Sequence, residues 1–171
     1  MRTLAFKNFL FVKLISLFTL SYLYLNLYID LLPPSLLKDY YRNLVILEYL
    51  DMTFLSWDFS QIFYFLLYGL RSLLGSINIL PIVSAFSLSI FIFSILYSKS
   101  LKRVLPFLIA ILIIPEIPIF YISLTRNALS QSLFLFIMVF WGVSNNFYQK
   151  IFLILTAIFS IIIHPSILFL Y

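Results

Sequence analysis

Cysteine is absent from the 171-residue sequence, and histidine occurs only once. Without cysteine the chain can form neither a disulfide framework nor a thiolate metal site, and a single histidine excludes a His-rich metal cage. Charged residues are also scarce, at 10% of the sequence against about 25% in soluble domains. Apolar residues make up 64% of the chain, more than a water-soluble fold can hide. The composition therefore indicates a protein embedded in a membrane.

Apolar runs of about 20 residues recur along the chain, and each is long enough to cross a hydrocarbon core of about 30 Å as a helix. Closed β-barrels, the other structures that span membranes, need short segments that alternate in polarity. Continuous apolar runs such as residues 151–164 do not alternate. The sequence therefore predicts an all-α membrane protein.

We expect one polytopic domain over residues 1–171, with about five transmembrane helices. The predicted spans are residues 8–29, 77–97, 104–125, 127–143 and 151–171. An outer loop, residues 30–76, separates the first two spans and holds five of the six acidic residues. Within it, segment 59–76 is apolar but too short to span comfortably, so an interfacial or re-entrant amphipathic helix is expected there. Pro115 and Pro118 should break the third span.

Basic residues predict the orientation, because cytoplasmic loops are enriched in Lys and Arg. If segment 59–76 does not span, then Arg2, Lys7, the basic cluster 99–103 and Lys150 all fall on the cytoplasmic side. Counting 59–76 as a span would place that cluster and Lys150 outside. We therefore expect a cytoplasmic N-terminus, with the first apolar run an uncleaved span because it lacks a cleavage site. The net charge of +5 is scattered over span ends, which argues against nucleic-acid binding.

Three ionisable residues in or beside the later spans are candidates for chemistry. Arg126 and His164 both fall towards the outer face. Ionisable residues within a membrane usually face a cavity or a partner. Position alone leaves open whether Arg126 anchors a helix end among headgroup phosphates or binds a substrate. His164 is either a hydrogen-bonded residue in the helix break before Pro165, or a base or phosphate ligand. Glu116 is the one acid expected to be buried within a span, either paired or protonated.

Four short motifs occur in order along the chain. They are Asp39-Tyr40, Trp57-Asp58-Phe59, Arg126-Asn127-Ala128-Leu129-Ser130 and His164-Pro165-Ser166. Their order resembles that of the Wzy-type polysaccharide polymerases, in particular the EpsG-like family. Members of that family tend to show an outer-loop Asp-Tyr, an acidic-aromatic stretch, an Arg-Gln-x-Leu-Ala start to a later span and a His-x-Ser motif closing the next span. Asn127 and Ser130 replace the usual Gln and Ala, and Asp58 lacks the Glu-Pro pairing common there.

The resemblance implies an enzyme, a membrane glycosyltransferase at the outer face of the bacterial inner (cytoplasmic) membrane. It would move a growing O-antigen, capsule or exopolysaccharide chain from undecaprenyl diphosphate onto another lipid-linked repeat unit. Arg126 would stabilise the diphosphate leaving group, and His164 or Asp39 would accept the proton of the acceptor hydroxyl. The residues expected to bind substrate are Tyr40, Asp58, Asn127 and Ser166.

The same resemblance implies no cofactor and no metal, because a lipid diphosphate already carries an activated bond. The implied partners are the undecaprenyl-diphosphate-linked glycan, membrane lipid, a flippase and a chain-length regulator. Family members continue through further spans, so the chain is expected to be the N-terminal part of such a polymerase.

Three alternatives stay open. One is a different lipid-linked-sugar glycosyltransferase or an O-antigen ligase. Another is a glycan transporter or flippase, in which Arg126 and Glu116 would line a substrate path and the proline breaks would form discontinuous helices. The last is an assembly subunit without chemistry of its own. The sequence shows no internal repeat of the kind that a flippase normally carries.

Overall fold

The computed structural model describes residues 2–49, 61–75, 79–98, 101–144 and 146–164, and in these ranges all regular secondary structure is helical. The prediction of an all-α protein is thereby confirmed. The helices are α1 (Arg2–Leu31), the short 3-10 helix η1 (Pro34–Leu36), α2 (Lys38–Tyr49), α3 (Ile62–Leu74), α4 (Ile79–Ser98), α5 (Leu101–Ile113), α6 (Glu116–Ser123), α7 (Thr125–Trp141) and α8 (Phe147–Ile163).

The number of helices that can cross a membrane is smaller than predicted. By length and apolarity, Val12–Leu31 of α1 and Ile79–Ser98 qualify among the described residues, and α5 with α6 makes a third if the bent pair counts as one span. Helices α7 and α8 occupy the fourth and fifth predicted positions, but each is 17 residues long. Two to three span candidates are therefore found where about five spans were predicted.

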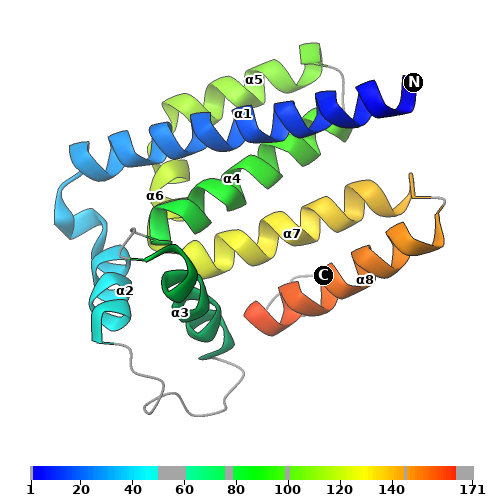
Figure 1. Ribbon diagram of the computed structural model, residues 1–171. Coiled ribbons are helices and arrows are strands. Elements are labelled where there is room, and N and C mark those ends of the chain that lie inside the picture. Colours follow the sequence, from blue (N-terminus) through cyan, green and yellow to red (C-terminus); the bar gives the residue numbers. More distant parts are fainter. Residues whose placement is uncertain (1, 50–60, 76–78, 99–100, 145, 165–171) are drawn as a thin grey trace.

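The long helices lie side by side in the order α1, α4, α7, α8, with the most extensive contacts between α4 and α7 (Figure 1). Helices α4 and α7 run in one direction and α1 and α8 in the other, so the end of α1, the start of α4, the start of α7 and the end of α8 meet at one end of the row. Helices α2, α3 and α6 gather at that same end. The start of α1, the start of α5 and the start of α8 lie at the opposite end, and with them Arg2, Lys102 and Lys150.

The predicted break in the third span is a bend of 74° between α5 and α6. Pro115 lacks a backbone N–H, so it cannot donate to the carbonyl of Ile111 four residues earlier. The hydroxyl of Tyr24 in α1 donates to that carbonyl instead, at 2.6 Å. Glu116 follows the bend and starts α6, where its carboxylate is favourable for the helix dipole. The side chain of Glu116 is exposed, so the expectation of a buried acid was wrong: Glu116 is not covered by the other described helices.

Small hydroxylated residues fill the contacts between the inner helices. The hydroxyls of Ser84 in α4 and Thr125 in α7 lie 3.0 Å apart, and both residues are completely buried. Small residues let helix backbones approach closely, and their hydroxyls can bond across the interface in an apolar medium. The α4–α7 contact is therefore held by packing and by a buried polar pair.

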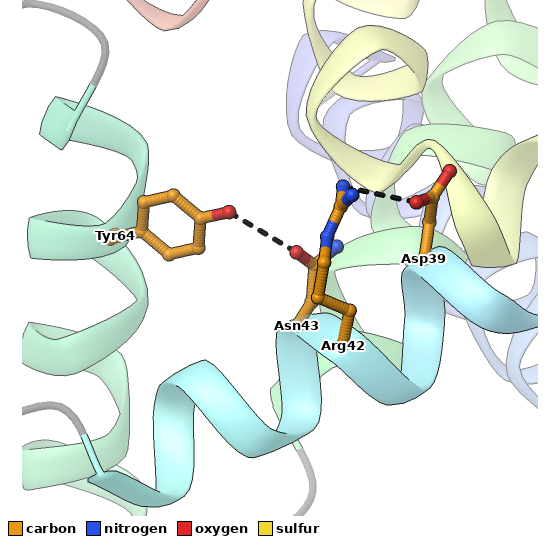
Figure 2. Close-up of polar contacts among 4 residues, drawn as sticks. All are labelled: Asp39, Arg42, Asn43 and Tyr64. Carbon is orange, nitrogen blue, oxygen red and sulfur yellow. Dashed lines mark hydrogen bonds and ion pairs between the residues drawn. The ribbon is translucent and has the colours of Figure 1, made fainter.

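The helix expected within 59–76 is present as α3, an apolar helix of 13 residues. It ends at Gly75, whose φ of 75° is a left-handed conformation that favours glycine. Hydrogen bonds join α3 to α2: the guanidinium of Arg71 donates to the Leu47 carbonyl. The Tyr64 hydroxyl donates to Asn43 Oδ1 at 3.1 Å (Figure 2). Helices α2 and α3 therefore form one unit at their end of the row.

Candidate functional site

Arg126 and His164 come together where the start of α7 meets the end of α8. Arg126 stands in the first turn of α7, and its Nε donates to the backbone carbonyl of Ile163 at 2.5 Å. His164 follows Ile163 directly and is the C-terminal capping residue of α8. Two residues that are distant in sequence thus form one cationic corner, here called the Arg126–His164 pair.

The residue order His164-Pro165 explains why α8 ends at this place. A residue before proline is disfavoured in the α conformation, and His164 is extended, with φ of −146° and ψ of 90°. Its backbone N–H still donates to the Ser160 carbonyl at 3.1 Å, which closes the last turn of the helix. The final carbonyls of a helix lack intrahelical donors and carry partial negative charge. Arg126 supplies both a donor and a positive charge to this helix end.

Two serines, Ser130 and Ser160, bond to each other one helical turn away from the Arg126–His164 pair, towards the middle of α7 and α8. Ser130 Oγ donates to the Ser160 carbonyl and Ser160 Oγ donates to the Ser130 carbonyl, each at 2.9 Å. Ser130 follows Arg126 by four residues and Ser160 precedes His164 by four, so the two contacts are stacked along the α7–α8 interface. Both serines are buried. This pair fixes the register in which Arg126 meets the end of α8.

Asp39 does not join the Arg126–His164 pair. Its carboxylate forms an ion pair with Arg42 in the same helix, with Arg42 Nη2 and Asp39 Oδ1 3.0 Å apart (Figure 2). Among the described residues, Asp39 makes no hydrogen bond or ion pair with Arg126 or His164. Tyr40 is 2% exposed and belongs to the hydrophobic core, with its ring edge-on to Tyr41 at 5.3 Å. Tyr40 therefore holds α2 in place.

The remaining predicted site residues fall in different places. Asn127 is half-buried in the first turn of α7, next to Arg126. Asp58 and Ser166 lie outside the described residues. Asp39 and Tyr40 belong to the first turn of α2, Arg126 and Asn127 to the first turn of α7, and His164 follows α8. Helix α2, the start of α7 and the end of α8 lie at the same end of the helix row (Figure 1).

Several residues that shape this corner were not singled out from the sequence. Arg42 is the ion-pair partner of Asp39, and the spacing of three residues on a helix was a signal for it. Ser160 bonds to Ser130, and its position four residues before His164, on the same helix face, was a signal for it. Ser123, three residues before Arg126, is buried, and its hydroxyl has no hydrogen-bond partner in the described part of the chain.

The described residues contain no group of three or more His, Asp or Glu side chains that could hold a metal ion. The polar groups at this corner are instead a guanidinium, an imidazole and hydroxyls. Such groups can bind an anionic oxygen and can exchange a proton with a hydroxyl.

Comparison of the chain with protein-family models, with curated proteins and with solved structures gave no match.

Proposed function

We propose that the chain is part of a polysaccharide polymerase of the Wzy type, similar to the EpsG-like family. The proposed reaction transfers a glycan from a lipid diphosphate to the sugar hydroxyl of a second lipid-linked unit. The observation that carries the proposal is the meeting of Arg126 and His164 at the end of the row that also carries α2. Two of the motifs behind the resemblance thus occupy one corner.

Arg126 has the chemistry that a diphosphate leaving group requires. Its Nε is used by the Ile163 carbonyl. Its two terminal nitrogens make no hydrogen bond with other described residues. A guanidinium held at one nitrogen presents the others in a fixed plane, and that fork suits two oxygens of a phosphate group. Stabilising the charge that develops on the leaving group is a large contribution to transfer reactions.

His164 is the better candidate than Asp39 for the group that accepts the proton of the acceptor hydroxyl. A general base has to lie within hydrogen-bond reach of the reacting group, directly or through one water. His164 is the residue after Ile163, whose carbonyl accepts the Arg126 hydrogen bond, whereas Asp39 is engaged by Arg42. In the proposed arrangement, Arg126 holds the diphosphate and His164 faces the incoming sugar.

The proposal includes five spans, a cytoplasmic N-terminus and α3 as an interfacial helix. Supporting it, Arg2, Lys102 and Lys150 lie at one end of the helix row and the Arg126–His164 pair at the other. The basic end is cytoplasmic by the positive-inside rule, which puts the pair on the outer side. A bacterial cytoplasmic membrane is the setting in which lipid-diphosphate glycans are joined on that side.

The test of this function is the Arg126→Ala variant of the full chain, in cells whose long-chain glycan depends on it. We expect the ladder of long chains on a glycan gel to disappear, while single repeat units stay attached to the carrier lipid. Lys38→Ala is the matched control, because Lys38 is an exposed cation at the same end of the row. An unchanged ladder in Arg126→Ala would refute the catalytic role.

The 74° bend between α5 and α6 favours one second candidate, a transporter of the lipid-linked unit, because discontinuous helices line the substrate paths of many transporters. The two candidates differ in where substrate accumulates after loss of function. A defective polymerase leaves single units on the outer face, whereas a defective transporter leaves them on the cytoplasmic face. Accessibility of the accumulated units to an added glycosidase in spheroplasts distinguishes them.

A further inference from the structure

Two adjoining cavities, of about 570 and 620 Å³, run along one face of the helix row. Both are lined by Phe86 of α4, Leu133 of α7 and Phe159 of α8, so they form one continuous groove. Phe18 of α1 forms one wall and Phe159 the other. Helix α1 packs on α4, α4 on α7 and α7 on α8, so α4 and α7 lie between the two walls and form the floor of the groove.

The groove is apolar and open. Apart from Thr156, the described residues that line it are all hydrophobic. Phe86 and Phe159 are 44% and 37% exposed, so their rings are not covered by other parts of the structure. An open apolar channel of this kind has the chemistry to hold a hydrocarbon chain.

A cation stands at one end of the groove. Leu129 lines the groove and follows Arg126 by three residues, so both lie on the same face of α7 about one turn apart. On α8, Phe159 lies about one turn before Ile163, whose carbonyl binds Arg126. From Leu129 the groove follows α7 to Phe136, about 10 Å at 1.5 Å per residue. The terminal nitrogens of Arg126 are thus placed close to the point where an apolar chain would leave the groove.

We propose that this groove binds the polyprenyl chain of the lipid-diphosphate substrate, with the diphosphate at Arg126. The inference rests on the proposed function, and it names the residues that hold the hydrophobic part of the substrate. A polyprenyl diphosphate carries its anionic group directly on a single chain, which fits a single groove with a cation at its end. A phospholipid has two chains that are joined to its phosphate through glycerol.

Site-specific photocrosslinking tests the proposal, and the absence of native cysteine makes it direct. The purified full chain carries Phe159→Cys, labelled with a benzophenone maleimide, in phosphatidylcholine vesicles that contain undecaprenyl diphosphate. Phe107→Cys is the matched control, because Phe107 is 42% exposed on α5 and does not line the groove. Intact-protein mass spectrometry identifies each adduct.

We expect the undecaprenyl diphosphate adduct at position 159 to exceed that at 107 about tenfold. The adduct should fall about tenfold when Arg126→Ala is added or when undecaprenol replaces the diphosphate, because a charged hydrogen-bonding partner is lost. Equal adducts at both positions, phosphatidylcholine as the main adduct at 159, or a crosslink between two copies of the chain would each overturn the groove assignment.

The failure of this proposal is distinguishable from failure of the proposed function. If Arg126→Ala abolishes polymer but position 159 never captures undecaprenyl diphosphate, the function stands and the groove assignment is wrong. If position 159 captures the lipid in an Arg126-dependent way while Arg126→Ala cells still make polymer, the groove stands and the catalytic role is wrong.

Discussion

Arg126 Nε donates a hydrogen bond of 2.5 Å to the backbone carbonyl of Ile163, so one side chain joins the start of α7 to the end of α8. The same side chain is proposed to hold the substrate diphosphate. These two roles use different nitrogen atoms of one planar group, and a lysine ammonium cannot reproduce that division.

Arg126→Lys should therefore separate the two roles. The retained positive charge near the end of α8 preserves about 0.3–1 kcal/mol of helix-dipole interaction, so the protein should accumulate in the membrane at a level close to that of the wild type. The amount of long-chain glycan per protein should fall at least about tenfold, because the bidentate fork is lost. Full polymer production by Arg126→Lys would contradict bidentate phosphate binding.

The reciprocal Ser130–Ser160 pair gives a prediction on stability. Ser130→Ala removes one interhelical hydrogen bond and should lower the free energy of unfolding by about 0.6 kcal/mol, with about 1.7 kcal/mol as an upper value. Ser130→Leu should cost more, since a bulky side chain must separate α7 from α8. Ser87→Ala is the control, because Ser87 is also buried but bonds only to Val83 within its own helix. Unfolding of the purified protein by SDS in mixed micelles measures all three variants.

The hydroxyl of Tyr24 donates to the Ile111 carbonyl at the bend between α5 and α6. Tyr24→Phe keeps the ring and leaves the Ile111 carbonyl without either an intrahelical donor or the phenol, which should cost about 1–3 kcal/mol. Tyr22→Phe is the matched control, because Tyr22 lies in the same helix and its hydroxyl makes no hydrogen bond with other described residues. Equal unfolding midpoints for the two variants in the SDS experiment would show that the contact contributes nothing.

Much of the fold could be predicted because the helix signals are local. The proline pair 115 and 118 predicted the break in the third apolar run, and a helix break at His164-Pro165 was one of the two interpretations of His164, although the predicted span continued to residue 171. The position of α3 also followed from composition, since a short apolar run with polar interruptions gives a short helix. These features need no knowledge of what lies beside them.

The contacts between helices could not be predicted in the same way. The exposure of Glu116 depends on the direction of a 74° bend, which proline alone does not specify. The position of Ser160 against Ser130 depends on the register of two helices, and many registers bury similar apolar surface. Whether Asp39 contacts the Arg126–His164 pair likewise depends on tertiary structure. The sequence therefore left His164 and Asp39 as equal candidates for the base.

The proposed orientation can be checked with single cysteines in this cysteine-free chain. Ser35→Cys lies at the end of the helix row that carries α2, while Ser98→Cys and Gln149→Cys lie at the opposite end, and all three positions are exposed. A membrane-impermeant maleimide should label position 35 in intact spheroplasts and the other two only after permeabilisation. The reverse pattern would place the Arg126–His164 pair in the cytoplasm and exclude a reaction on the outer face.

His164 and Asp39 are the two candidate bases, and their contributions should differ. His164→Gln keeps a polar side chain but removes the basic imidazole, and loss of a general base typically costs at least about 100-fold in rate. Asp39→Asn should cost less than about tenfold, because Asp39 makes no hydrogen bond or ion pair with Arg126 or His164 in the described structure.

Arg42→Ala is the control for indirect effects of Asp39. The Asp39–Arg42 pair is exposed, at 39% and 66% of the two side chains, and such a pair contributes at most about 1 kcal/mol. The rate of chain elongation in isolated membranes, normalised to protein level, measures all three variants. If Asp39→Asn abolishes elongation while His164→Gln retains it, Asp39 takes the role of base.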